Sequence, residues 1–99
     1  YNQAPCQYVD QLLEKAEAAG VYLMPAIWPH DAVRGSASPL GAANWTDNAY
    51  STICAASAFT NTTVAGADTP QWIAQKNFFR YLTARFGHST ALAGWIGIE

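Results

Sequence analysis

The chain has 99 residues, with five Lys and Arg against seven Asp and Glu, and its formal net charge is −2. The cations are few and scattered, which excludes the basic stripe on which nucleic-acid binding depends, and the longest apolar stretch is too short for the about 20 residues that span a bilayer. Only 12% of the residues are charged and 51% are apolar, whereas about 25% of the residues in an ordinary soluble domain are charged. The composition is therefore typical of the interior of a larger protein.

The first elements that the sequence predicts are a helix and a strand. Over Tyr8 to Ala19, apolar side chains recur every three or four residues with charged ones between them, which is typical of an amphipathic helix. Gly20 follows, where a left-handed helix cap is easily formed. The run 21–28 is apolar without alternation, as expected of a strand covered on both faces of a parallel sheet. Because Pro25 has no N–H to donate, we expect a bulge or an unpaired position there.

A long loop and a second helix and strand come next. Residues 29–70 show no periodicity and are rich in small and polar side chains, and loops of this length carry function or short hidden helices. Thr69 and Pro70 then predict the N-cap and first turn of a helix over 71–86. Another apolar run of strand length covers 91–98.

The chain therefore repeats one plan, an amphipathic helix followed by a glycine and a buried strand. This order predicts an α/β fold with parallel strands joined by right-handed crossovers. Two strands cannot cover their own edges, and a (β/α)₈ barrel takes about 250 residues. We interpret 1–99 as a single segment of a TIM barrel, two helix–strand units with a long intervening loop, completed by the same or another chain. The alternative is a small open α/β domain complete in itself.

Candidate binding residues follow the predicted strands, because ligands of parallel α/β folds bind at the carboxyl ends of the strands. Trp28, His30 and Asp31 lie at the end of the first strand, and Glu99 ends the second. An aromatic ring stacks on the C–H face of a sugar, and carboxylates accept its hydroxyls, so the partner that we expect is a polysaccharide or oligosaccharide. For Trp28 and His30 the alternatives are packing and a loop hydrogen bond. For Asp31 the alternatives are a turn residue or an ion-pair partner of Arg34. For Glu99 the alternative is a solvated acid at the end of the chain.

The pattern for a bound metal or cofactor is missing from the sequence. His30 and His88 lie far apart in the sequence. The two cysteines do not form a CxxC motif, and the two histidines do not form an HExxH motif. The sequence also lacks the GxSxG elbow of serine hydrolases and the glycine-rich loops that hold phosphates. We therefore predict no metal site and no cofactor.

Both helix–strand units resemble a known family. The stretches NFFRYLTARFGHS and LAGWIGIE, over 77–89 and 92–99, resemble the third helix and fourth strand of retaining glycoside hydrolases of the (β/α)₈-barrel clan, the cellulase- and mannanase-like families. The stretch LLEKAEAAGVYLM over 12–24 is similar to the preceding helix and third strand. Asn48-Ala49-Tyr50 resembles the Asn-Pro-Tyr motif that some members carry in the following loop.

The resemblance implies a glycosidase that hydrolyses β-linked polysaccharide through two carboxylates. It assigns substrate contacts to Trp28, His30 and Tyr50, and the acid/base to the Glu at the end of the fourth strand. In the family that Glu lies five residues beyond the strand's Trp, whereas Glu99 lies four beyond Trp95, so either Glu99 or the next residue is the acid/base. The nucleophile belongs to the seventh strand, and we expect the isolated chain to be inert.

The cysteines and the N-glycosylation sequons indicate in which cellular compartment the protein resides. Cys6 and Cys54 allow one disulfide, with two buried thiols as the alternative. Asn44 and Asn61 begin N-x-S/T sequons in the polar loop. Together these features predict a secreted, disulfide-bonded glycoprotein.

A second class of function competes with the hydrolase. A non-catalytic carbohydrate-binding or scaffold α/β module would keep Trp28, Trp45, Tyr50 and the sequons without needing a catalytic pair. In the parent enzyme we expect Trp28→Ala to weaken oligosaccharide binding with little loss of fold stability.

Overall fold

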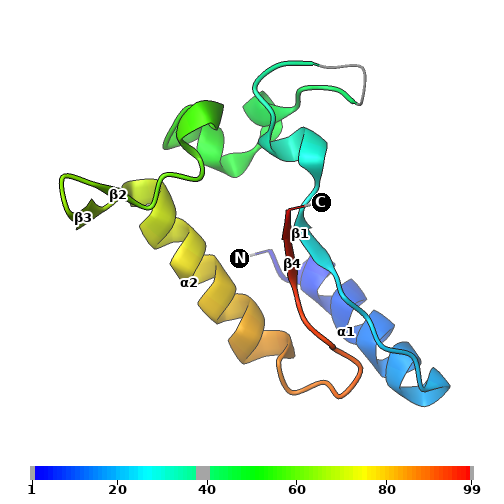
Figure 1. The fold of residues 1–99 in the computed structure, drawn as a ribbon. Coiled ribbons are helices and arrows are strands. Elements are labelled where there is room, and N and C mark those ends of the chain that lie inside the picture. Colours follow the sequence, from blue (N-terminus) through cyan, green and yellow to red (C-terminus); the bar gives the residue numbers. More distant parts are fainter. Residues whose placement is uncertain (1, 38–40, 99) are drawn as a thin grey trace.

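The computed structural model describes residues 2–37 and 41–98 and shows a small α/β fold, as predicted. Two helices, α1 (Gln3–Ala19) and α2 (Pro70–Phe86), accompany a parallel pair of strands, β1 (Ala26–Trp28) and β4 (Ile96–Ile98) (Figure 1). Between β1 and α2, the described residues form short 3₁₀ helices and a hairpin: η1 (His30–Val33), η2 (Trp45–Asp47), η3 (Ala49–Thr52), η4 (Ala56–Ala58), β2 (Thr63–Val64) and β3 (Ala67–Asp68).

Helix α1 begins five residues before the predicted start. Asn2 is its N-cap, and the side-chain Oδ1 of Asn2 accepts a hydrogen bond from the backbone N–H of Ala4 at 3.1 Å. The helix ends as predicted at Gly20, whose φ of 66° lies in the left-handed region and whose N–H reaches the carbonyl oxygens of Ala16 and Glu17. The predicted glycine cap is therefore confirmed.

Helix α2 has the predicted bounds to within one residue. The Oγ1 of Thr69 accepts a hydrogen bond from the N–H of Trp72 at 3.3 Å, and Pro70 occupies the first turn. Both helices are 17 residues long. Their position and direction therefore follow from local capping signals in the sequence.

The two strands run side by side in the same direction. Ala26 lies opposite Ile96, and Trp28 lies opposite Ile98. Each strand is three residues long, shorter than the predicted runs 21–28 and 91–98. Because the pairing is parallel, both carboxyl ends lie at one edge of the sheet, as the repeated helix–strand plan predicts.

The ladder is interrupted at Pro25, as predicted. A parallel bridge joins Leu23 to Leu92 before the interruption. Between this bridge and β1 the first strand has two residues, whereas the second has three, 93–95, so the register shifts by one as in a β-bulge. Pro25 still takes part in the pairing through its carbonyl oxygen, which accepts from the N–H of Ile96 at 3.0 Å.

A small core joins the helices to the base of the strands. Phe86 of α2 is 2% exposed, and its ring lies 6.3 Å from that of Trp95 just before β4. An ion pair across the helices, between Arg85 Nη2 and Asp10 Oδ2 at 2.6 Å, holds α1 beside α2. The buried residues of this core are Cys6, Leu13, Ala16, Phe86 and Ala91.

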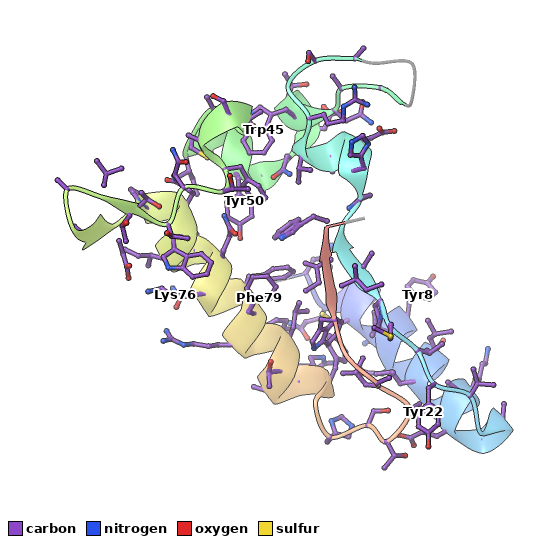
Figure 2. All side chains as sticks on the ribbon, viewed as in Figure 1. Tyr8, Tyr22, Trp45, Tyr50, Lys76 and Phe79 are labelled. Atoms are coloured by element: carbon purple, nitrogen blue, oxygen red, sulfur yellow. The ribbon has the colours of Figure 1, made fainter. Side chains whose placement is uncertain are left out.

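Much apolar surface stays outside this core. The radius of gyration is 15.4 Å, against about 13 Å for a compact domain of this length. The accessible surface is 6466 Å², against about 5,500 Å² for a compact monomer of this mass. Tyr8 and Tyr22 are 75% and 76% exposed and point away from the body (Figure 2). Within the described residues, none of the helices has the length and apolar character that crossing a bilayer requires.

A carboxylate ties the end of α1 to the segment before β4. Glu17 Oε1 accepts from the hydroxyl of Ser89 at 2.6 Å and from the N–H of Thr90 at 3.0 Å. The hydrogen bond from Ser89, and then that from Thr90, lower the pKa of Glu17 below its ordinary value. The charged carboxylate is therefore the form that the folded chain prefers.

This linkage predicts a pH-dependent effect of Glu17→Gln. A lowered folded-state pKa contributes stability that is present above the unfolded-state pKa and is lost as the pH falls through the folded-state value. We expect Glu17→Gln to lower the melting temperature at about pH 7 and to lower it less at acid pH, once the pH lies below the lowered folded-state pKa and wild-type Glu17 is neutral as well. Thermal unfolding of both proteins across this range measures the difference. Glu14→Gln, on the exposed face of the same helix, is the control, and an equal effect of both substitutions at both pH values would contradict the prediction.

Candidate functional site

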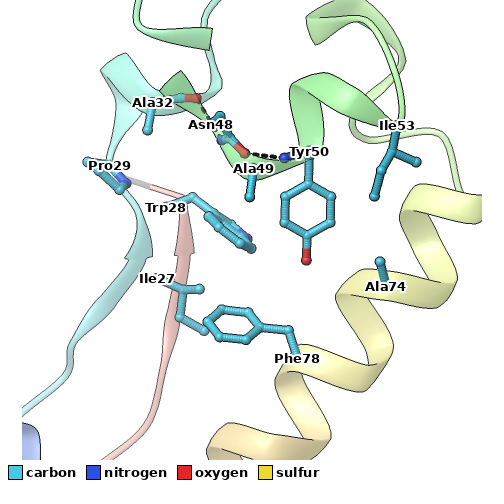
Figure 3. A pocket seen from close by; sticks show the side chains of 10 residues that line it. All are labelled: Ile27, Trp28, Pro29, Ala32, Asn48, Ala49, Tyr50, Ile53, Ala74 and Phe78. Carbon is cyan, nitrogen blue, oxygen red and sulfur yellow. Dashed lines mark hydrogen bonds between the residues drawn. The ribbon is translucent and has the colours of Figure 1, made fainter. Parts of the chain in front are cut away.

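A hollow of about 570 Å³ opens at the carboxyl end of β1 (Figure 3). Its size lies within the range of about 300–1,000 Å³ that small-molecule sites occupy. Three segments that are distant in sequence form it: the end of β1 with η1, the turn of η3, and the N-terminal half of α2. The lining residues are Ile27, Trp28, Pro29, Ala32, Asn48, Ala49, Tyr50, Ile53, Ala74 and Phe78.

Trp28 is the centre of an aromatic cluster at this hollow. Its ring lies edge-on to Tyr50, with centroids 5.2 Å apart and planes at 90°, and edge-on to Phe59 at 5.6 Å. The ring of Phe78 lies 5.4 Å away at a tilt of 41°. These are favourable aromatic geometries. Trp28 is therefore a packing residue, which is the alternative considered above, and it also forms part of the wall of the hollow.

Asn48 fixes the position of Tyr50. Its Oδ1 accepts from the N–H of Tyr50 at 2.9 Å, and its Nδ2 donates to the carbonyl of Ala32 at 2.8 Å. Asn48 thus caps η3 and ties it to η1. Tyr50 is 8% exposed, and its ring projects from η3 toward Phe78 (Figure 3). The Asn48-Ala49-Tyr50 stretch therefore has a structural role that its resemblance to a family motif did not specify.

Three contributors to the site, Ala74, Phe78 and Phe59, were missed by the sequence analysis. Phe78 and Ala74 lie one helical turn apart on α2 and face the hollow together. This four-residue spacing in the sequence indicates that the two side chains share one face of the helix. Phe59 packs against Trp28, Tyr50 and also Trp45, whose ring centroid is 5.4 Å away. No local pattern around Phe59 indicates this contact.

His30 and Asp31 lie in η1, and the lining of the hollow includes neither. Asp31 Oδ1 is 3.6 Å from His30 Nδ1 and 3.8 Å from Arg34 Nη1. Arg34 also donates to the carbonyl of Gly41 at 3.1 Å. The pairing of Asp31 with Arg34 is one of the alternatives considered above, and its effect is to hold the loop beyond β1. A substrate contact by His30 or Asp31 stays a prediction.

The predicted acid/base, Glu99, lies outside the described residues. No carboxylate belongs to the ten lining residues. In the described part of the chain, no group of three or more His, Cys, Asp or Glu side chains is placed to hold a metal ion. The described lining of the hollow is therefore almost entirely apolar and aromatic.

The predicted disulfide between Cys6 and Cys54 is wrong for this structure, in which both thiols are free. Cys6 is buried between α1 and α2, where its Sγ lies 3.2 Å from the hydroxyl of Tyr81 and donates to the carbonyl of Asn2 at 3.3 Å. Cys54 follows η3 in the loop, and burial raises the pKa of its thiol. Cys6 belongs to the core between the helices, whereas Cys54 lies in the loop just after η3.

Both sequon asparagines are accessible. Asn44 is exposed just before η2, and Asn61 is exposed just before β2. An acceptor asparagine needs such a surface position. Glycosylation at Asn44 and Asn61 stays a prediction.

Comparison with known proteins gives no match for this chain. No family model, no curated protein and no solved structure is significantly similar to it. The function therefore has to be argued from the hollow and from the strands that position it.

Proposed function

We propose that the chain is a segment of a (β/α)₈ glycoside hydrolase barrel and forms one wall of its carbohydrate-binding cleft. The observation that carries the proposal is the parallel pairing of β1 with β4, in which Trp28 lies opposite Ile98. The carboxyl ends of both strands then share the edge at which the aromatic hollow opens. Barrel enzymes bind their substrates at this edge.

The incomplete packing of the chain supports the barrel. In the described residues, β1 and β4 form a two-stranded sheet and have no further partner strand. Such a pair leaves unpaired backbone groups along both outer edges. Together with the exposed apolar side chains of Tyr8, Leu12, Tyr22 and Met24, these edges favour a larger body in which neighbouring barrel units cover them.

The proposed substrate is a β-linked polysaccharide, and the proposed reaction is retaining hydrolysis. That reaction needs a general acid and a nucleophile with carboxyl groups about 5 Å apart. Glu99 or the residue after it would be the acid/base, and the rest of the barrel would supply the nucleophile. Trp28 would contribute an apolar surface against which a sugar stacks. The proposal includes secretion, which the accessibility of Asn44 and Asn61 supports.

A second candidate is a non-catalytic carbohydrate-binding or scaffold module. One observation favours it, namely that the residues lining the hollow include no carboxylate. Such a module would hold sugar at the same hollow and would lack turnover in every context.

Activity assays test the proposal and separate the two candidates. We expect the 99-residue chain to release no reducing sugar from mannan or carboxymethyl-cellulose, because the catalytic pair is incomplete in it. A longer polypeptide that contains this segment is expected to hydrolyse one of these polymers with retention of anomeric configuration, which proton NMR of the first product measures. Turnover by the 99-residue chain alone would contradict the segment proposal. Binding without turnover by the longer polypeptide would favour the non-catalytic module.

A further inference from the structure

The lining of the hollow is poor in groups that recognise sugar hydroxyls. Every lining residue except Asn48 has an apolar or aromatic side chain. The amide of Asn48 is engaged at both ends, by the N–H of Tyr50 and the carbonyl of Ala32. The other polar groups of the lining side chains are the hydroxyl of Tyr50 and the indole N–H of Trp28. A hexose has several hydroxyls, and these two groups cannot form hydrogen bonds with all of them. A sugar ring buried here would leave polar groups unpaired at a cost of about 1–3 kcal/mol each.

An aromatic ring fits the same hollow without this cost. Trp28, Tyr50 and Phe78 present ring faces and edges toward one space (Figure 3). A further ring with its centroid about 4.5–7 Å from theirs would extend the edge-on and tilted pattern that these side chains already form. Cavities of about 150 Å³ are enough for benzene, so about 570 Å³ admits an aromatic ring and the first atoms of an attached group.

We propose that the hollow is a subsite for the aromatic group of an aryl β-glycoside, with the attached sugar at the mouth beside the strand ends. The sugar part of this inference rests on the proposed function, whereas recognition of the ring rests on the lining alone. The subsite would select substrates or acceptors whose sugar carries a phenolic group. It would also place that group against Trp28.

A comparison of ligands on the unmodified 99-residue chain tests the proposal. We expect phenyl β-D-glucoside to bind at least about tenfold more tightly than methyl β-D-glucoside, because burial of a phenyl ring contributes that much from its apolar area. Tryptophan fluorescence titration measures the affinities, and saturation-transfer NMR should show the strongest transfer at the phenyl protons. Equal affinities of the two glucosides would overturn the proposal.

A cavity-filling substitution locates the subsite. Ala74→Phe places a ring in the hollow and should remove the preference for the phenyl glucoside. Ala84→Phe makes the same change at an exposed position of the same helix and should leave the preference unchanged. A preference that survives in folded Ala74→Phe would overturn the assignment of the hollow. If Ala74→Phe unfolds the chain, the ligand comparison on the unmodified chain still decides the proposal.

The outcomes separate this inference from the proposed function. If phenol binds as tightly as phenyl β-D-glucoside, the sugar contributes nothing and the carbohydrate function fails while the aromatic subsite stands. If oligosaccharides bind and the phenyl group adds no affinity, the subsite fails while the carbohydrate function stands.

Discussion

Replacement of Phe86 by alanine is expected to lower the free energy of unfolding by about 3–5 kcal/mol, the range for a buried aromatic side chain. Phe86 is 2% exposed and lies where α1, α2 and the segment before β4 meet. Its removal leaves a cavity in the core cluster that also contains Leu13 and Ala91. Urea unfolding followed by circular dichroism measures the loss.

Two further substitutions show whether the position of Phe86 accounts for that loss. Phe86→Leu keeps most of the apolar volume and should cost less than about 1.5 kcal/mol. Phe79→Ala removes the same side chain from a half-buried position on the same helix and should cost less than Phe86→Ala. Equal losses from Phe79→Ala and Phe86→Ala would mean that the core does not lie where the structure places it.

Trp28→Ala is expected to affect both stability and binding. Its ring contacts Tyr50, Phe59 and Phe78, so its removal should lower the free energy of unfolding by about 2–4 kcal/mol, somewhat below the range for a fully buried ring. These contacts revise the expectation from sequence that stability would be spared. Affinity for oligosaccharides should fall at least about tenfold, because the wall of the hollow collapses.

Conservative and distant tryptophan variants separate the two roles of Trp28. Trp28→Phe keeps a ring in the cluster and should recover most of the stability while binding stays weakened. Trp72→Ala removes a tryptophan from α2 whose ring contacts Lys76 rather than the hollow, and it should leave binding unchanged. Calorimetry of unfolding and of oligosaccharide binding on each variant measures both effects. Loss of binding by Trp28→Ala with an unchanged melting temperature would assign Trp28 to ligand contact alone.

The helices and the direction of the strands could be predicted from sequence because their signals are local. Gly20 ends α1 and Thr69 with Pro70 begins α2 through contacts within one turn. Two strands that each follow a helix favour parallel pairing, and the missing N–H of Pro25 marks the interruption of their ladder. The lengths of the strands depend on neighbouring elements, and the observed pairing is limited to Ala26–Trp28 with Ile96–Ile98 and to the bridge between Leu23 and Leu92.

The candidate site could be predicted only in part. Trp28 was found because it ends a strand, and Tyr50 because its motif resembles that of a family. The short 3₁₀ helices η3, which contains Tyr50, and η4, which Phe59 follows, have no 3.6-residue period to detect. The approach of Phe59 to Trp28 depends on how the whole loop packs on α2, which no spacing in the sequence encodes. Sequence alone could not choose between a disulfide and two free thiols, because it does not give the distance between the cysteines, and in the structure Cys6 packs against Tyr81.

The central claim is that carbohydrate binds at the mouth of the aromatic hollow, beside the shared carboxyl edge of β1 and β4. Titration of the ¹⁵N-labelled chain with cellohexaose and mannohexaose, followed by heteronuclear NMR, tests this claim residue by residue. We predict that the shift changes gather at the indole N–H of Trp28 and at the amides of Ala49, Tyr50 and Phe78. Changes confined to the exposed face of α1 around Tyr8, or no change with either sugar, would contradict it.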